Sequence, residues 1–87
     1  MNSNLLKDKV ALITGGAGGI GLAVASAYCQ NGASVVLTDF DENKLIEAKN
    51  KLQGSVLPLA LDVTNEDQTL SVIDCAIEKF GKIDIVV

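Results

Sequence analysis

The pattern of hydrophobic and polar positions divides the chain into seven segments, which alternate between strand-like and helix-like patterns. Four short runs are rich in aliphatic and β-branched residues, as expected for buried parallel strands, and cover residues 10–13, 34–38, 56–61 and 83–87. Three longer segments repeat apolar residues every three or four positions, as amphipathic helices do, and cover residues 19–31, 41–52 and 64–80. The pattern predicts a β-α-β-α-β-α-β order, which is an α/β chain with a Rossmann-type doubly wound parallel sheet.

Each predicted helix is expected to pack one apolar stripe against the sheet. The stripes comprise Ile20, Ala23, Val24, Ala27 and Tyr28 in the first helix, Leu45, Ala48 and Leu52 in the second, and Leu70, Ile73, Ile77 and Phe80 in the third. Pro58 lies in the third strand and cannot donate a hydrogen bond to a neighbouring strand, so this strand is expected at a sheet edge. Right-handed crossovers in the order 3-2-1-4 place it there.

A glycine-rich stretch, Ile-Thr-Gly-Gly-Ala-Gly-Gly-Ile-Gly, joins the first strand to the first helix. A helix that starts at such a turn presents unpaired N–H groups and the positive end of its dipole, which favours a bound diphosphate. The glycine-rich stretch matches two motifs, G-x-G-x-x-G and T-G-x-x-x-G-x-G. A glycine-rich turn that binds no ligand is the alternative. The residues expected to hold the diphosphate are Gly15, Gly18, Gly19, Ile20 and Gly21.

Asp39 follows the second strand, 18 residues after Gly21. In a dinucleotide-binding βαβ unit, an acidic residue about 20 residues beyond the glycines accepts hydrogen bonds from the ribose hydroxyls. Its charge would repel the 2′-phosphate of NADP, and no Lys or Arg occupies the loop, so NAD is the expected cofactor. Phe40 is expected either to pack along the adenine ring or to make a contact at the edge of the core.

The stretch from Thr14 to Gly21, after Lys-Val-Ala-Leu-Ile, resembles the cofactor-binding start of the short-chain dehydrogenase/reductases. The resemblance runs to Val87 and covers only the first part of a full-length member. It implies that the carboxylate of Asp62 binds the exocyclic amine of adenine and that Val63 packs on the ring. A turn or capping aspartate is the alternative for Asp62.

The resemblance also implies a catalytic Ser, Tyr and Lys, with the Lys four residues after the Tyr. Tyr28 is the only tyrosine and Gly32 stands four residues later, so no catalytic residue is expected here. Residues 1–87 are therefore interpreted as an incomplete NAD(P)-binding Rossmann domain of an oxidoreductase that moves hydride between nicotinamide and an alcohol or carbonyl. The full-length enzyme is expected to be a homo-oligomer. A non-catalytic nucleotide-binding module and an S-adenosylmethionine-dependent methyltransferase are the alternatives.

Composition and charge bear on whether the chain binds nucleic acid, membranes or metal ions. The net charge is −4 and the seven Lys and Arg residues are scattered, which argues against nucleic-acid binding. The polar start and the lack of any apolar run near the ~20 residues of a membrane span predict a cytoplasmic protein with no membrane role. With no His and no C-x-x-C, no metal site is expected, and Cys29 and Cys75 are interpreted as small buried residues.

Overall fold

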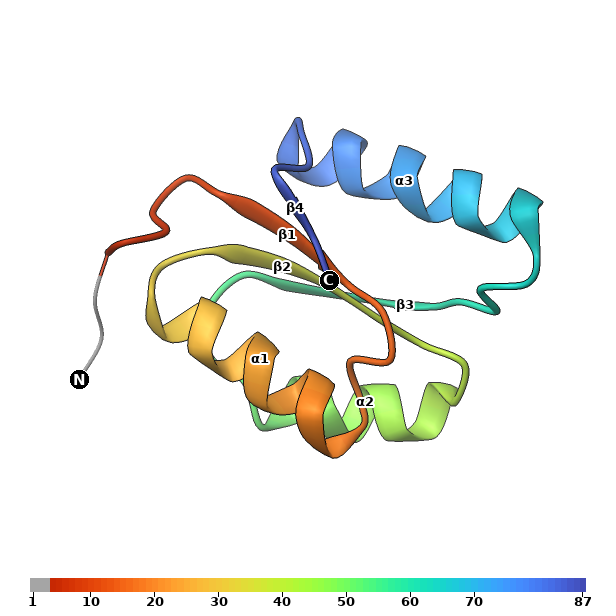
Figure 1. Cartoon of the computed structure of the whole chain (residues 1–87), viewed down its shortest axis with the longest axis horizontal. Coiled ribbons are helices and arrows are strands. Elements are labelled where there is room, and N and C mark those ends of the chain that lie inside the picture. Colours follow the sequence, from red (N-terminus) through yellow and green to blue (C-terminus); the bar gives the residue numbers. More distant parts are fainter. Residues whose placement is uncertain (1–3) are drawn as a thin grey trace.

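A computed structural model describes residues 4–87, and the first residues of the expected polar start, 1–3, lie outside the described part. Strands and helices alternate as β1 (Val10–Ile13), α1 (Gly19–Gln30), β2 (Ser34–Asp39), α2 (Glu42–Asn50), β3 (Val56–Ala60), α3 (Glu66–Phe80) and β4 (Ile85–Val86). All strand pairs are parallel and the order is β3-β2-β1-β4 (Figure 1). The Rossmann-type sheet and its 3-2-1-4 order are therefore confirmed.

The two central strands, β1 and β2, form the buried middle of the sheet. Every residue of β1 is buried, because β2 flanks it on one side, β4 on the other, and helices cover both faces. In the described part of the chain β3 pairs with β2 alone, with Pro58 opposite Leu37. The proline thus lies in an edge strand, as predicted, where its missing N–H costs no ladder hydrogen bond.

Helices cover the sheet on both sides (Figure 1). On one face, α1 and α2 pack onto a buried cluster that comprises Ile13, Ala25, Val35, Leu37, Leu45 and Ala48. On the other face, α3 packs onto a second cluster that comprises Val10, Leu12, Val36, Leu61, Val72 and Ala76. Alternate residues of each strand thus serve opposite faces, and burying each Val, Leu or Ile contributes about 1.5–3 kcal/mol.

The predicted face of α2 is confirmed, but that of α1 is only partly right. Val24 and Tyr28 pack against the core as expected, whereas Ile20 is 86% exposed and Ala25, outside the predicted stripe, is fully buried. Nearly every position of α1 is small or apolar, so the 3.6-residue period gives no unique face.

The predicted face of α3 is also shifted. Val72 and Ala76 are buried and Phe80 packs against them, whereas Leu70 and Ile77 are 57% and 47% exposed. The helix carries two neighbouring apolar stripes that share Phe80. The stripe with the smaller side chains, which lets the helix lie close to the sheet, faces the core.

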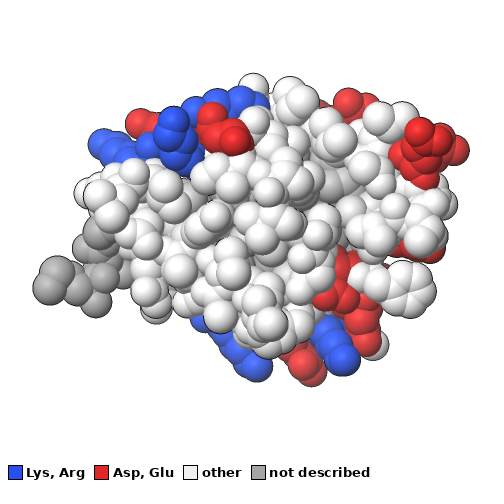
Figure 2. Space-filling model, viewed as in Figure 1, with Lys and Arg blue, Asp and Glu red and all other residues white. Residues whose placement is uncertain are grey.

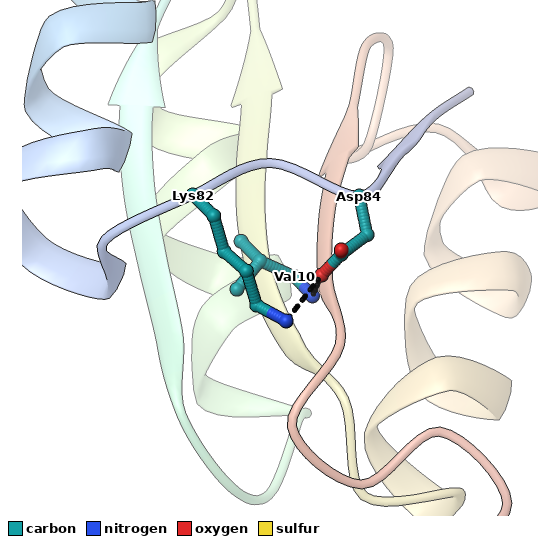
Figure 3. Close-up of polar contacts among 3 residues, drawn as sticks. All are labelled: Val10, Lys82 and Asp84. Carbon is teal, nitrogen blue, oxygen red and sulfur yellow. Dashed lines mark hydrogen bonds and ion pairs between the residues drawn. The ribbon is translucent and has the colours of Figure 1, made fainter.

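A polar contact at the amino-terminal edge of the sheet aligns β4 with β1. The Asp84 carboxylate accepts a hydrogen bond from the Val10 N–H at 2.8 Å and lies 3.1 Å from the Lys82 ammonium, as Figure 3 shows. The Asp84 N–H in turn donates to the Val10 carbonyl at 2.8 Å. The Val10 hydrogen bond above all, and then Lys82, hold the pKa of Asp84 below its usual value. β4 is shorter than the predicted residues 83–87.

Candidate functional site

The glycine loop between β1 and α1 folds tightly onto itself. Gly15 has φ of +63°, which side chains rarely adopt, and its carbonyl accepts a hydrogen bond from the Gly18 N–H at 3.3 Å. A Cβ on Gly21 would overlap the Gly15 carbonyl, and a Cβ on Gly16 would overlap the Leu37 side chain. The loop therefore needs glycine at positions 16 and 21 for its own packing.

The amino-terminal end of α1 is open to an anion. Its N-cap is Gly18, no side chain caps it, and its first turn holds no acidic residue. Within residues 4–87, the N–H groups of Gly19, Ile20 and Gly21 donate no hydrogen bond. A Cβ on Gly19 would meet nothing within 4 Å. Three unpaired donors at the positive end of a helix dipole suit a diphosphate.

Asp39 ends β2 and reaches the glycine loop. Its carboxylate accepts hydrogen bonds from the N–H of Ala17 at 3.1 Å and of Asp41 at 3.0 Å. Asp41 itself caps α2 by accepting from the Lys44 N–H, so Asp39 is not the capping residue. A carboxylate has about four acceptor sites, so Asp39 retains capacity for the hydroxyls of a ligand.

Asp62 follows β3 in a tight turn. One carboxylate oxygen accepts from the N–H of Thr64 at 2.9 Å and from its hydroxyl at 2.6 Å. These two bonds, with the hydroxyl bond the stronger influence, hold the pKa of Asp62 below its usual value. The capping residue of α3 is Asn65, which accepts from the Gln68 N–H. Asp62 is thus a turn aspartate whose second oxygen makes no hydrogen bond within the described residues.

One cleft at the carboxyl ends of β1, β2 and β3 collects most of the expected site residues. It encloses about 350 Å³ and is lined by Thr14, Gly15, Thr38, Asp39, Phe40, Leu61, Asp62 and Val63. Phe40 and Val63 are 78% and 66% exposed at its rim, and neither is among the residues that pack against the two core clusters. Gly18 and Gly19 line a neighbouring hollow, and Ile20 and Gly21 line neither.

Two features near the loop were not expected from the sequence. Thr38, the one buried polar residue in the described part of the chain, lies at the base of the cleft. Lys44 and Lys51 line the neighbouring hollow of about 320 Å³, beside Ala17 and Gly18. Neither lysine lies within the glycine loop itself, where a cation for the 2′-phosphate of NADP was expected to lie if one were present. The signal that could have identified Lys44 is its position in the first turn of the helix that follows Asp39.

The rest of the described chain offers few other centres for chemistry. Among residues 4–87, no three His, Cys, Asp or Glu side chains are grouped to hold a metal ion, and no helix is long and apolar enough to cross a membrane. The interpretation of both cysteines as buried is wrong for Cys75, which lies in α3 and is exposed. Cys29 is half-buried, and burial raises the pKa of its thiol.

Comparison with known proteins assigns the family. A family model described as short chain dehydrogenase matches residues 9–87. The 12alpha-hydroxysteroid dehydrogenase of a Clostridium species is 44% identical over 95% of this chain and 36% of its own length. A short chain dehydrogenase structure from Mycobacterium smegmatis has a TM-score of 0.90 and 35% identity, and covers 99% of this chain and 38% of that one.

A third relative carries a nicotinamide cofactor. The 3-ketoacyl-(acyl-carrier-protein) reductase from Brucella melitensis, solved in complex with NADH, has a TM-score of 0.89 and 34% identity over 93% of this chain and 33% of its own. The chain thus spans about a third of the length of the proteins it matches. These matches decide against the methyltransferase alternative. The chain belongs to the short chain dehydrogenase family.

Proposed function

We propose that residues 1–87 bind the adenosine-diphosphate half of NAD(H) as an incomplete Rossmann domain of an oxidoreductase. That enzyme would move hydride between the cofactor and an alcohol or carbonyl substrate. One observation carries the proposal: the unpaired N–H groups of Gly19, Ile20 and Gly21 and the carboxylate of Asp39 are held together by the Ala17 N–H. Diphosphate donors and a ribose acceptor are thus arranged side by side.

Each expected residue has a role in this proposal. Gly15 makes the turn out of β1, and the first turn of α1, capped by Gly18, holds the diphosphate with its backbone. Asp39 takes the ribose hydroxyls, while Asp62, Phe40 and Val63 surround the adenine, the last two from the exposed rim of the cleft. When bound, nicotinamide would supply the hydride acceptor or donor, and this chain's residues would orient its distant adenosine end.

The proposed cofactor is NAD(H) rather than NADP(H). No cation lines the cleft, and Asp39 would face the 2′-phosphate of NADP. Two unit charges 4 Å apart repel by about 4 kcal/mol at an effective dielectric of 20, so even a several-fold discount for solvent leaves at least tenfold discrimination. Lys44 lines the neighbouring hollow together with Ala17 and Gly18 and does not line the cleft.

Calorimetric titration of the complete gene product with NADH and NADPH tests the choice. We expect NADH to bind at least tenfold more tightly and Asp39→Asn to bring the two affinities within about threefold of each other. Asp74→Asn, the same charge change on the exposed surface of α3, serves as the matched control and should leave the ratio unchanged. Equal or tighter NADPH binding by the parent protein would refute the choice of NAD(H).

Turnover separates the enzyme from the second candidate, a non-catalytic nucleotide-binding module. We place the catalytic residues outside residues 1–87, so the complete gene product should oxidise some member of an alcohol panel with NAD. Tight NADH binding without turnover on any alcohol or ketone would favour the module. The proposed cytoplasmic location rests on the polar start and the lack of an apolar run of membrane-spanning length in the sequence, and cell fractionation tests it. The proposed homo-oligomeric state rests on the family resemblance, and light scattering tests it.

A further inference from the structure

Thr38 stands out because its hydroxyl is buried at the base of the cleft. The residue is 1% exposed, and its hydroxyl donates a hydrogen bond of 2.8 Å to the carbonyl of Ile13. A buried hydroxyl costs free energy unless it is hydrogen-bonded, and a β-branched side chain has few rotamers. This hydroxyl is therefore held in one direction, toward the last residue of β1.

That bond is the first of three contacts that tie the end of β1 and the glycine loop to the end of β2. The second runs from the Gly16 N–H to the Thr38 carbonyl at 2.8 Å. The third runs from the Ala17 N–H to the Asp39 carboxylate at 3.1 Å. The regular pairing of β1 with β2 ends at Ile13 opposite Leu37, so these contacts continue the connection where the strands stop.

We propose that Thr38 is a positioning residue of the cofactor site, whose hydroxyl fixes the glycine loop relative to Asp39. The inference rests on the proposed function, because it concerns how one ligand reaches both groups. A dinucleotide must contact the first turn of α1 and the Asp39 carboxylate at once. Any displacement of the end of β1 relative to the end of β2 therefore lowers the affinity for the dinucleotide. A ligand that contacts only the Asp39 side is insensitive to that displacement.

Hydroxyl-free and hydroxyl-bearing variants separate this role from packing. Thr38→Val keeps the branched shape but removes the donor, and Thr38→Ala is a second variant without a donor. Thr38→Ser keeps the donor and loses a methyl group, so it is the conservative rescue. The probes are adenosine, which lacks phosphates, and ADP, which carries the diphosphate, each titrated calorimetrically into the complete gene product.

We expect the ratio of ADP to adenosine affinity to fall about fivefold to tenfold in Thr38→Val and Thr38→Ala, the range for loss of one hydrogen bond. Thr38→Ser should keep the ratio within twofold of the parent. An unchanged ratio in both hydroxyl-free variants, or an equal loss for both ligands, would overturn the role of Thr38. A parent protein that binds neither probe would instead overturn the proposed function, and the inference with it.

Discussion

Gly19 and Gly21 lie two residues apart in the first turn of α1, yet alanine at each should have a different effect. At position 21 the new Cβ would overlap the Gly15 carbonyl oxygen and lie 2.9 Å from the Gly15 carbonyl carbon and the Gly16 Cα. These are backbone atoms and cannot rotate away, so the loop must shift. Overpacking of this kind costs about 1–3 kcal/mol of stability, against a helix-propensity gain of at most about 1 kcal/mol.

At position 19 the same methyl group would meet nothing within 4 Å. Gly19→Ala should therefore leave the fold as stable as the parent or stabilise it by up to about 1 kcal/mol. The methyl group would, however, occupy the open space beside the unpaired N–H groups where we place the diphosphate. Hydrogen bonds to a charged group contribute about 1.5–3 kcal/mol each, so losing one should weaken NADH binding roughly tenfold to a hundredfold.

Two measurements on the same preparations check this pair. Denaturant unfolding gives the free energy of unfolding, and calorimetric titration gives the dissociation constant for NADH. We expect Gly21→Ala to lose stability, and Gly19→Ala to lose NADH affinity with its stability intact. Parent-like stability of Gly21→Ala would refute the packing argument. Parent-like NADH affinity of Gly19→Ala would refute the placement of the diphosphate.

Three further predictions follow from local geometry and charge. Asp8 has φ of +66°, so Asp8→Gly should raise the free energy of unfolding by about 0.5–1 kcal/mol, while Asp8→Ala keeps the strain and should not. The pKa of Asp84 is lowered by Val10 and Lys82, so its stabilisation should be complete above about pH 3.9 and be lost as pH falls through the lower folded-state pKa. Unfolding midpoints of the parent should thus fall more on acidification than those of Asp84→Asn. The cleft is lined by Asp39 and Asp62, and Glu47 offsets one of the two lysines of the neighbouring hollow, so the NADH dissociation constant should change less than about twofold between ~50 and ~500 mM salt, and a steep rise would contradict this.

The sheet order could be predicted because the signals for it are local. Four apolar runs of strand length gave β1 to β4, and glycines such as Gly81 gave the helix ends. Pro58 alone excludes a central position for β3, because proline cannot donate to a neighbouring strand. Right-handed crossovers between parallel strands then leave few possible strand orders. Each of these signals depends on one residue and its neighbours in sequence.

The buried faces of α1 and α3 could not be predicted in the same way. Periodicity identifies a face only when the other positions are polar, as in α2, where charged residues surround Leu45 and Ala48. In α1 most positions are small or apolar, and α3 carries two neighbouring apolar stripes. In both helices, tertiary packing rather than periodicity determines which face is buried. Ile20, Leu70 and Ile77 are the large apolar residues that periodicity assigned to the core and that are exposed in the described part of the chain.

The candidate site shows the same division. The cleft unites Asp39 with Asp62 because the carboxyl ends of neighbouring parallel strands meet at one edge, which the strand order already implied. Thr38 and Lys44 escaped prediction because their significance lies in contacts between elements. One is a hydroxyl that reaches across to the end of β1, and the other is a cation brought beside the loop by the first turn of α2.

The charge distribution constrains how such a site can hold a dinucleotide. Acidic residues gather over the end of the molecule where α3 begins with Glu66 and Asp67, whereas lysines gather over the opposite end and, together with further acidic residues, along the lower edge of the view (Figure 2). The cleft therefore opens on the acidic side of a chain whose net charge is −4. Glu47 offsets one of the two lysines of the neighbouring hollow, so long-range attraction of an anionic dinucleotide is weak and we expect affinity to come mainly from short-range donors. The backbone N–H groups of the first turn of α1 are such donors, and they add no charge that salt could screen.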